Sequence, residues 1–362
     1  MKKLPKDIKV VVAMSGGVDS SVVAAMMVEQ GYQVVGVTMQ LYDHGLTLGK
    51  KGACCAGQDI YDAKMVADRL NIPHYVLNYE SLFKESVIDN FADSYLRGET
   101  PIPCVRCNQT VKFRDLLQMA KSLEADALCT GHYVRKSRQI HGSELLKGID
   151  HNKDQSYFLF ATTKEQLDYT YFPLGKYTKE ETRRIATKHG LIVADKPDSQ
   201  DICFVPDGDY ASVINKYRPG ALDKGDILHV NGEKLGEHNG IINYTIGQRK
   251  GLGISSADPL YVIKILPDLK QVIVGPPDAL YKSKFIIQEV NWLAEFYDHP
   301  LHVSVKIRSS QDTVPAQITL LPNHKAEVIL TFLERAVTPG QACVVYQGER
   351  VLGGGWITEA IS

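Results

Sequence analysis

The stretch "AMSGGVDSS", residues 13–21, decides the fold of this chain. It overlaps the end of the apolar run "IKVVVAM" (8–14), which predicts a buried strand. It leads into "SVVAAMMVEQG" (21–31), whose apolar spacing predicts a helix that ends at Gly31. A strand that turns into a helix through glycines directs backbone N–H groups and the positive end of the helix dipole toward one point. The stretch therefore predicts an anion site, which we call the phosphate loop.

The residue types in the phosphate loop suit a phosphate and a magnesium ion. Gly16 and Gly17 let the backbone approach a phosphate closely, and Asp19 can orient Mg²⁺. Hydroxyl donors come from Ser15, Ser20 and Ser21. No Gly-Lys-[Ser/Thr] follows, so this is not a Walker loop, and a lone Gly-Gly pair is often only a tight turn. The whole S-G-G-x-D-S string resembles the pyrophosphatase-type (PP) loop of ATP enzymes that cleave between the α and β phosphates.

Strand-like and helix-like segments alternate through the first 205 residues, which predicts βαβ units on a doubly wound parallel sheet. The further predicted strands are "YQVVGVTM" (32–39), "HYVLNY" (74–79) and "ALCTGHY" (127–133). The further predicted helices are "DIYDAKMVADRLNIP" (59–73), "TVKFRDLLQMAKSLEAD" (110–126) and "TKEETRRIATKHGL" (178–191), the last with Thr178 and Glu181 in capping-box spacing.

Ligands of such sheets bind beyond the carboxyl ends of the strands. Met39 ends the second predicted strand, and Gly131 and His132 follow the core of the fourth. We expect Met39 at an adenine edge and the other two near ribose or phosphates. A core methionine and an internally bonded histidine are the plain alternatives.

The chain changes character after residue 205. Short strand-like pieces with many glycines, such as "VNGEKLGEHNG" (230–240), are followed by alternation such as "LHVSVKIRSS" (301–310). This alternation fits a small antiparallel barrel. We predict an α/β domain over 1–205, a small central β-rich domain over 206–275 and a C-terminal antiparallel β-barrel over 276–362.

Composition excludes several classes of protein. The chain has 362 residues, 44% hydrophobic and 23% charged, with a net charge of −1, so any nucleic-acid partner needs local basic patches. No stretch approaches the roughly 20 apolar residues that span a bilayer, and a cytoplasmic location is expected. In that location the seven cysteines are expected to be thiols, metal ligands or catalytic groups rather than structural disulfides.

The cysteines allow several interpretations. Cys104 and Cys107 have the spacing of half a zinc site, but the adjacent Cys54 and Cys55 make a poor second half. Cys107 precedes a predicted helix with basic residues, which would lower its thiol pKa. Cys203 falls where the α/β domain meets the β-rich part, a usual place for substrate sites. The remaining two, Cys129 and Cys343, lie in apolar strand patterns and are expected to be buried.

Seven strings in order along the chain resemble the bacterial tRNA-specific 2-thiouridylases, enzymes that thiolate the wobble uridine of tRNA. They are "MSGGVDSSV", "CNQTVKF", "TGHY", "KDQSYFL", "DSQDICF", "YTIGQRKGLG" and "TPGQACVVY". The resemblance covers essentially the whole chain. It implies an adenylating α/β domain of the PP-loop ATP pyrophosphatase type, a small central domain and a β-barrel that helps to hold tRNA.

The resemblance also implies roles for individual residues. Cys107 matches the family's nucleophile, and Cys203 matches the cysteine that carries a persulfide. The ATP site falls on Ala13, Met14, Ser15, Gly16, Gly17, Val18, Asp19, Ser20, Met39 and Gly131. Contacts to tRNA fall on Ile102, Pro103, Cys104, His132, Lys153, Asp154, Gln155, Arg308, Ser309 and Gln341.

The implied reaction uses ATP and Mg²⁺ to convert uridine O2 into an adenylate, with release of pyrophosphate. A sulfur-carrier protein loads Cys203 as a persulfide. Its terminal sulfur, or hydrosulfide freed by attack of Cys107, then adds at carbon 2 and expels AMP. The second route leaves a Cys107–Cys203 disulfide that must be reduced. A monomer without a membrane partner is expected, and no residues are assigned as ligands of a metal ion apart from the Mg²⁺ that accompanies ATP.

Cys104 departs from the family pattern, in which many members have Asn-Pro-Asp where this chain has Ile102-Pro103-Cys104. A thiol cannot replace the carboxylate. It can form a resolving disulfide with Cys107, or it can complete an iron–sulfur site with Cys107 and Cys203. We favour the cluster-free route.

The target base must leave the anticodon stack. The side chains that we expect along its path, unless they form only a solvated charged face, are Tyr133, Arg135, Lys136, Arg138, Lys153 and Tyr157.

Two other functions remain open at this point. One is a ligase that adenylates a carboxylate or a purine, although the chain has no glutaminase signature and a ligase has no need of Cys107 and Cys203. The other is a zinc-stabilised RNA-binding module without catalysis. Retained tRNA binding with stoichiometric zinc and no pyrophosphate release would favour the second.

Overall fold

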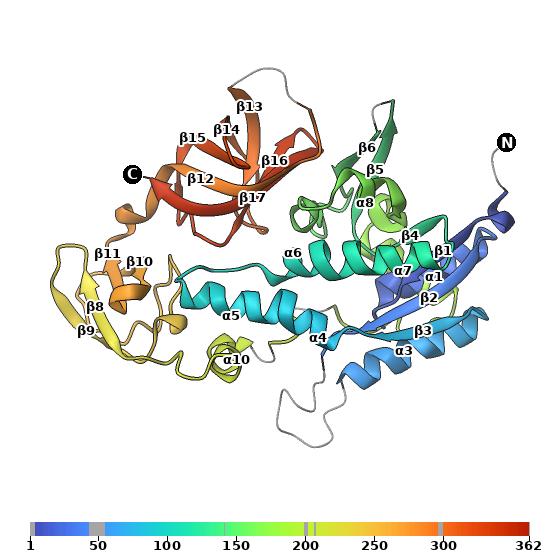
Figure 1. Ribbon diagram of the computed structural model, residues 1–362, viewed down its shortest axis with the longest axis horizontal. Coiled ribbons are helices and arrows are strands. Elements are labelled where there is room, and N and C mark those ends of the chain that lie inside the picture. Colours follow the sequence, from blue (N-terminus) through green and yellow to red (C-terminus); the bar gives the residue numbers. More distant parts are fainter. Residues whose placement is uncertain are drawn as a thin grey trace. The chain divides into compact units, whose positions relative to one another are not determined.

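The computed structural model describes residues 4–42, 55–140, 142–198, 202–205, 208–295 and 300–361 (Figure 1). Cys54 and the side chain of Cys55 lie outside this part. The chain divides into two compact units. The first unit comprises Met1–Ser86, Cys104–Pro206 and Glu349–Val351, and the second comprises Val87–Pro103, Asp207–Gly348 and Leu352–Ser362.

The first unit is built on a five-stranded sheet in the order β3-β2-β1-β4-β7. The strands are β1 (Lys9–Ala13), β2 (Gln33–Gln40), β3 (His74–Asn78), β4 (Ala127–Cys129) and β7 (Thr170–Tyr171), and these neighbours pair in parallel. The chain runs outward from β1 to β3 and then returns to the other side of β1. The order therefore reverses between β1 and β4, as in doubly wound sheets, which confirms the predicted fold class.

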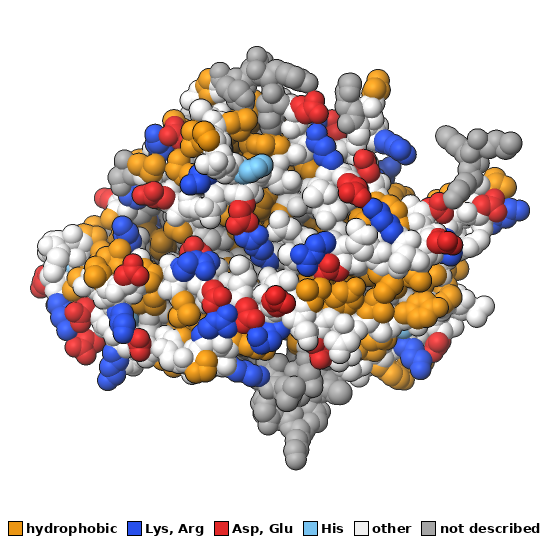
Figure 2. All heavy atoms as spheres, viewed as in Figure 1, with side chains coloured by type: hydrophobic (Ala, Val, Ile, Leu, Met, Phe, Trp, Pro, Cys, Tyr) orange, Lys and Arg blue, Asp and Glu red, His pale blue; other side chains and the backbone are white. Residues whose placement is uncertain are grey.

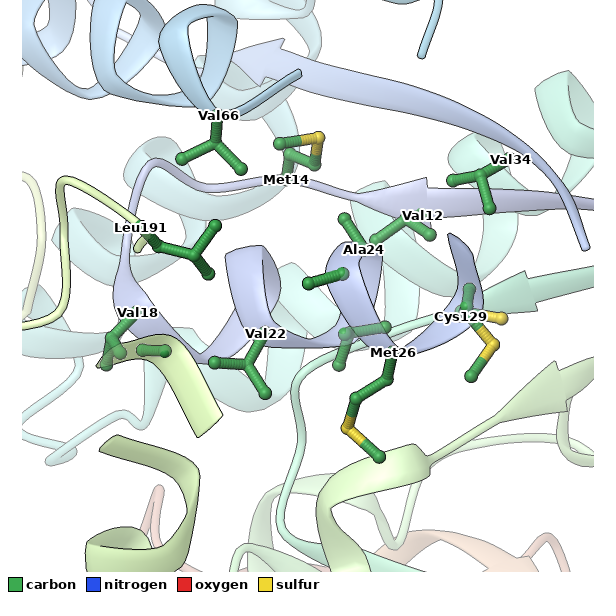
Figure 3. Close-up of a cluster of buried hydrophobic side chains, with 14 of the residues drawn as sticks. Val12, Met14, Val18, Val22, Ala24, Met26, Val34, Val66, Cys129 and Leu191 are labelled. Atoms are coloured by element: carbon green, nitrogen blue, oxygen red, sulfur yellow. The ribbon is translucent and has the colours of Figure 1, made fainter. Parts of the chain in front are cut away.

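The core of the first unit explains why the opening stretch folds as it does. Helix α1 (Val18–Glu29) follows β1, and Gly31 just after it has a φ of 83°, a left-handed conformation that glycine adopts without strain. Val12 and Met14 belong to one buried hydrophobic cluster with Val22, Ala24 and Met26 of α1 (Figure 3). Side chains of α3 (Cys55–Leu70) and α9 (Lys179–Lys188) complete this cluster, which fixes the two ends of the phosphate loop.

The helices near Cys107 differ in part from the prediction. One helix was expected over 110–126, but the helical segment begins earlier, with α6 (Pro103–Cys107), and ends earlier, with α7 (Leu117–Ser122). Between them lies a π-helical stretch, η3 (Asn108–Leu116), whose wider turns start directly after Cys107. Such π-helical turns are frequent at functional sites. Upstream lie the short helix α4 (Glu80–Phe83) and α5 (Asp89–Leu96).

A hairpin of β5 (Val134–Gln139) and β6 (Gly142–Lys147) was not predicted, because its charged side chains hide the strand pattern. Arg350 and Val351 of β17 (Arg350–Ile361) pair with β6. Tyr133 and Tyr157 are 2% and 1% exposed, so the expectation that they line a path for a base is wrong. Lys136 of β5 also points inward, since its Nζ donates to backbone carbonyls, among them that of Thr170 at 2.6 Å.

The second unit contains a four-stranded sheet in the order β10-β11-β8-β9. Its strands are β8 (Gly225–His229), β9 (Lys234–His238), β10 (Tyr261–Leu266) and β11 (Gln271–Gly275), around a small core that includes Ile227 and Val262. Helix α10 (Tyr210–Tyr217) precedes the sheet and was not predicted. The expected small β-rich module is otherwise present.

The C-terminal strands of the second unit form a closed antiparallel barrel in the order β12-β15-β14-β13-β16-β17, which the β12–β17 pairing closes. The strands not yet bounded are β12 (Tyr281–Trp292), β13 (Leu301–Lys306), β14 (Val314–Leu321), β15 (Lys325–Arg335) and β16 (Ala342–Gln347). Its interior is apolar and includes the buried Cys343. The predicted barrel is confirmed.

The distribution of charge and the character of the helices bear on possible partners. Basic and acidic side chains are interspersed over the face seen in Figure 2, consistent with the net charge of −1. Within the described ranges, none of the helices has the length and apolar character that a membrane crossing requires.

Candidate active site

The phosphate loop is held closed by its own hydroxyl groups. The Ser15 N–H donates to Ser20 Oγ at 3.0 Å, and Ser21 Oγ donates to the Gly17 carbonyl at 2.8 Å. Gly16 has a φ of 71°, and a Cβ there would lie 2.2 Å from the Asp59 carbonyl oxygen. Only glycine fits this position, because the loop is pressed against the first turns of α3. Ser15 at the tip is exposed, and its hydroxyl is 3.2 Å from Ser20 Oγ.

Lys196 fastens the loop from outside it. Its Nζ donates to the Gly16 carbonyl at 3.0 Å, to Asp59 Oδ1 at 2.7 Å and to Asp62 Oδ2 at 2.5 Å. Partial burial lowers the pKa of Lys196, but the hydrogen bonds to the two aspartates outweigh it and the net pKa is raised. The loop, α3 and the segment around Lys196 are therefore joined through one ammonium group with three acceptors.

Asp19 is held by groups that the sequence did not reveal. Lys179 Nζ lies 2.7 and 2.9 Å from its two carboxylate oxygens, and the Tyr133 hydroxyl donates to Oδ1 at 2.8 Å. Burial, followed by the charge of Asp19, raises the pKa of Tyr133, so this hydroxyl remains a donor. Asp19 is thus paired with the Lys179 ammonium group and bonded to the Tyr133 hydroxyl.

A second carboxylate, Asp198, extends this pairing. It accepts from Lys153 at 2.7 Å and from Lys179 and Arg183 at 2.9 Å each. Burial alone would raise the pKa of Asp198, but the hydrogen bonds from Lys153 and Lys179 outweigh it and lower the pKa to about 2. Apart from the basic character of the helix "TKEETRRIATK", no signal in the sequence marks this cluster.

The residues after β4 lie against the phosphate loop, as the topology predicts. A Cβ on Gly131 would come within 3.1 Å of Asp19 and of the Ser20 nitrogen, so a side chain there would push into the loop. Met39 is half-buried at the end of β2. The side chains of Met14 and Val18 point into the core instead, so only their backbone can face a ligand.

His132 packs against the rings of Phe113 and Phe172, with centroid distances of 5.7 and 6.5 Å. Its Nδ1 is 2.9 Å from Thr130 Oγ1. Burial, followed by the charge of Lys112, lowers the pKa of His132 to about 3, so the ring is neutral near pH 7. Any contact that it makes to a nucleotide is a neutral hydrogen bond.

The "KDQ" triplet mostly serves the protein itself. Asp154 accepts from the Gly148 N–H at 2.9 Å and from Ser156 Oγ at 2.7 Å. Gln155 Oε1 accepts from the Tyr133 N–H at 2.9 Å. With Lys153 bound to Asp198, these contacts fix the turn that carries Tyr133, and a role in binding tRNA stays a prediction.

The three thiols of interest are in the first unit and act on one another electrostatically. Cys104 is exposed and Cys107 is 8% exposed, one helical turn apart on α6. The nearby thiols of Cys107 and Cys104 contribute to a raised pKa at Cys203. All three are thiols rather than disulfides. The structure therefore brings together the two residues predicted to be catalytic, and Cys104 lies near enough to act on Cys203 as well.

The segment that carries Cys203 is anchored by aromatic rings. Phe204 packs edge-on against Phe83 with centroids 5.7 Å apart, and Tyr42 packs on the same Phe83 at 6.0 Å. The Tyr42 side chain also hydrogen-bonds to Cys203. Cys203 is accessible to solvent and yet surrounded by protein atoms, whose desolvating effect is the main reason that its pKa rises to about 12.

The expectation that a helix N-terminus lowers the pKa of Cys107 is wrong. Cys107 has helical φ and ψ angles and lies inside continuous helical backbone rather than ahead of it. Burial raises the pKa of its thiol, and the charge of Lys112 acts in the opposite direction without offsetting that rise. Cys107 is consequently a protonated thiol at rest.

The other residues predicted to contact tRNA lie in the second unit. Gln341 Nε2 donates to the Thr100 carbonyl at 2.8 Å, beside the half-buried Ile102 and the buried Pro103. Arg308 donates to the Arg335 carbonyl, and Ser309 next to it is exposed. Two of these predicted sites, Gln341 and the 102–103 segment, are thus close together within the unit.

The next question is which side chains could hold a metal ion. Among the residues that the structure describes, no cluster of three or more His, Cys, Asp or Glu side chains is arranged to hold a metal ion. Mg²⁺ often binds through one or two carboxylates together with substrate phosphates. Asp19 suits that mode, because it stands at the first turn of α1 where the phosphates of a nucleotide would lie.

Three sequence profiles match the chain. One described as the tRNA methyl transferase HUP domain covers residues 8–207, one described as the tRNA methyl transferase PRC-barrel domain covers 211–276, and one described as the aminomethyltransferase beta-barrel domain covers 282–357. The tRNA-specific 2-thiouridylase MnmA of Rickettsia massiliae (strain Mtu5) is 66% identical over 358 residues, 98% of each chain. The protein of the same name from Rickettsia felis is also 66% identical over 98% of each chain.

The chain belongs to the MnmA family of tRNA-specific 2-thiouridylases. The resemblance seen in the sequence is thereby confirmed for the whole chain. Two solved structures are also similar. A 4-thiouridine synthetase in complex with RNA and bound ATP is 17% identical, with a TM-score of 0.38 over 55% of this chain and 45% of that one. The NMN synthetase of Francisella tularensis is 16% identical, with a TM-score of 0.32 over 53% of this chain and 66% of that one.

Proposed function

We propose that this protein catalyses the ATP-dependent 2-thiolation of the wobble uridine of tRNA, by adenylation of uridine O2 followed by sulfur transfer from a Cys203 persulfide. Membership of the family makes the protein a sulfurtransferase that acts on tRNA. The observation that supports the finer mechanism is the phosphate loop beside Gly131 at the reversal of strand order, in the unit that also holds the Cys107 and Cys203 thiols.

In the adenylation step the phosphate loop binds the phosphates of ATP. Its backbone N–H groups at the start of α1 and the Ser15 hydroxyl supply neutral donors, and Lys179 supplies a charge. Asp19 is the residue that would hold Mg²⁺, which would neutralise charge on the departing pyrophosphate. Met39 and the backbone of Ala13, Met14 and Val18 complete the proposed nucleotide site.

In the sulfur step a persulfide-donor protein loads the accessible Cys203. The terminal sulfur, or hydrosulfide released when Cys107 attacks the Cys203 sulfur, adds to carbon 2 of the adenylated uridine, and AMP leaves. Thiolate attack on a persulfide requires Cys107 to lose its proton, and burial, which raises the pKa of its thiol, opposes that loss.

Binding of tRNA is assigned to both units. In the first unit we propose Cys104, His132 and the "KDQ" triplet, and in the second Ile102, Pro103, Arg308, Ser309 and Gln341. The same proposal includes three domains over residues 1–205, 206–275 and 276–362, a monomeric state and a reducing cytoplasmic setting.

The decisive test is incubation of the purified protein with ATP, a persulfide donor and unmodified tRNA, followed by analysis of the nucleosides. We expect 2-thiouridine together with AMP and pyrophosphate. Cys203→Ser should still bind tRNA but should form no 2-thiouridine from the persulfide donor. Full activity of this variant would refute the persulfide role, and absence of 2-thiouridine from the parent under aerobic and anaerobic reducing conditions would refute the function.

A further inference from the structure

Cys104 and Cys107 form a pair with opposite exposure. They are three residues apart on one helix, so both project from the same side of α6, with Cβ atoms about 5–6 Å apart. Disulfides need Cβ atoms about 3.5–4.5 Å apart, so a small adjustment of this turn would join them. Cys104 is exposed whereas Cys107 is 8% exposed. One member of the pair is therefore within reach of a solution partner.

The same two thiols both act on Cys203 electrostatically, so the three sulfurs form one local group. Cys203 must be a free thiol to accept a new sulfur. A disulfide between Cys107 and Cys203 would block it. The Cys107 sulfur of that disulfide is buried, so an outside thiol could attack only at Cys203, whereas a thiol on the same helix could attack Cys107 and set Cys203 free.

We propose that Cys104 is a resolving thiol: it attacks the Cys107 sulfur of the Cys107–Cys203 disulfide and passes the disulfide to an accessible Cys104–Cys107 pair. This inference rests on the proposed function, because the disulfide that it resolves forms during sulfur transfer. It assigns a chemical role to the residue that departs from the family pattern.

The steps balance. Attack of the Cys107 thiolate on the Cys203 sulfur of the persulfide forms the Cys107–Cys203 bond and releases hydrosulfide. The Cys104 thiolate then forms a bond to the Cys107 sulfur, the Cys107–Cys203 bond breaks, and Cys203 leaves as a thiolate that takes up a proton. No net electrons move in this exchange. A dithiol protein finally reduces the Cys104–Cys107 disulfide, supplying two electrons and two protons and becoming a disulfide itself.

The first arm of the test does not depend on thiolation. One equivalent of a mild thiol oxidant is added to the reduced protein, remaining thiols are alkylated, and disulfides are mapped by mass spectrometry. We expect a Cys104–Cys107 disulfide with alkylated Cys203. A Cys107–Cys203 disulfide that persists beside an alkylated Cys104 would overturn the proposal.

The second arm follows one turnover of the persulfide-loaded protein with ATP and tRNA. A thioredoxin-type dithiol protein is then added, and recovery of the Cys203 thiol is timed. In Cys104→Ser we expect the disulfide to stay at Cys107–Cys203 and the recovery to slow at least tenfold, whereas a small phosphine should reduce both proteins at similar rates. Equal recovery with the dithiol protein would refute a resolving role.

The outcomes separate the two proposals. If the parent makes no 2-thiouridine, the proposed function fails, while the oxidation arm still decides whether the exchange occurs. Stoichiometric iron and sulfide in anaerobically purified protein, lost in Cys104→Ser, would make the three thiols cluster ligands and would also overturn the resolving role.

Discussion

Lys179 and Asp19 are 160 residues apart in the chain, yet the Lys179 ammonium group lies 2.7 and 2.9 Å from both carboxylate oxygens of Asp19. Only 12% of the Lys179 side chain is exposed, and the same ammonium group contacts Asp198. The carboxylate of the phosphate loop is thus paired with a partly buried cation. Binding of phosphates and a cation would compete with this ion pair. Lys179 would then pair with the phosphates, and Asp19 with the cation.

Replacing Lys179 by methionine should therefore weaken nucleotide binding. Methionine keeps the length of the stem and removes the charge, which leaves Asp19 facing the phosphates without compensation. A hydrogen bond to a charged group contributes about 1.5–3 kcal/mol, so we expect ATP affinity to fall roughly 10- to 100-fold. Calorimetry with ATP and Mg²⁺ measures this change.

Lys188→Met is the matched control, because Lys188 is on the same helix but pairs with Glu29 at the surface. Exposed pairs contribute little to stability or to a distant site. ATP affinity should be unchanged in this variant. An equal loss in both variants would show that the helix, rather than the Lys179 charge, is responsible.

Replacing Lys196 by methionine should loosen the phosphate loop itself. The variant removes the Lys196 ammonium group from the Gly16 carbonyl and from Oδ2 of the buried Asp62, whose Oδ1 still accepts from Gln58 at 2.7 Å. An unsatisfied buried group costs about 1–3 kcal/mol. We expect the free energy of unfolding to fall by about that amount and ATP affinity to fall with it.

Denaturant unfolding with and without ATP measures both effects. Lys64→Met is the control, since Lys64 is an exposed lysine of α3. A Lys196→Met variant with parental stability and parental ATP affinity would contradict a role in shaping the loop.

Asp198 should make the free energy of unfolding depend on pH in the acidic range. Its pKa is about 2 in the folded chain against an ordinary value of 3.8, so the unfolded chain binds the proton more readily. The stabilisation by Asp198 is therefore present above about pH 3.8 and is lost as the pH falls through about 2. Asp198→Asn should be less stable than the parent at pH 7, and the difference should shrink below pH 4 in denaturant titrations. A difference that is constant over this range would rule out the ionic contribution.

The secondary structure that depends on neighbouring residues was predicted correctly from the sequence. The strand, glycine turn and helix at residues 8–31 are present, and Thr178 and Glu181 form both hydrogen bonds of the predicted capping box. These features depend on residues within a few positions of one another, whose chemistry alone decides the local geometry. The alternation of the C-terminal strands likewise follows from one face that packs in the barrel core.

Features that depend on distant residues were not predictable. Nothing near Asp19 marks Lys179 as its partner, because the pair forms only when α9 packs on α1. Cys107 was expected to be an activated thiol from its neighbours in sequence, but its burial comes from the rest of the fold. The β5–β6 hairpin was missed because its charged residues look like a solvated surface in the sequence. In the fold, Arg135 and Lys136 instead donate hydrogen bonds to backbone carbonyls.

The raised pKa of Cys203 makes a prediction about its reactivity. With a pKa of about 12 against an ordinary value of 9.0, only a small fraction is thiolate at neutral pH. Alkylation by iodoacetamide should rise about tenfold for each pH unit between 7 and 10 and should show no plateau there, because the thiolate is the reacting species. Any stabilisation from the neutral thiol is present below about pH 9 and is lost as the pH rises toward 12. Peptide mass spectrometry at timed intervals measures the rate at Cys203. A plateau near pH 8 would show that the resting thiol is activated, and it would place the activating group in the protein rather than in its substrate.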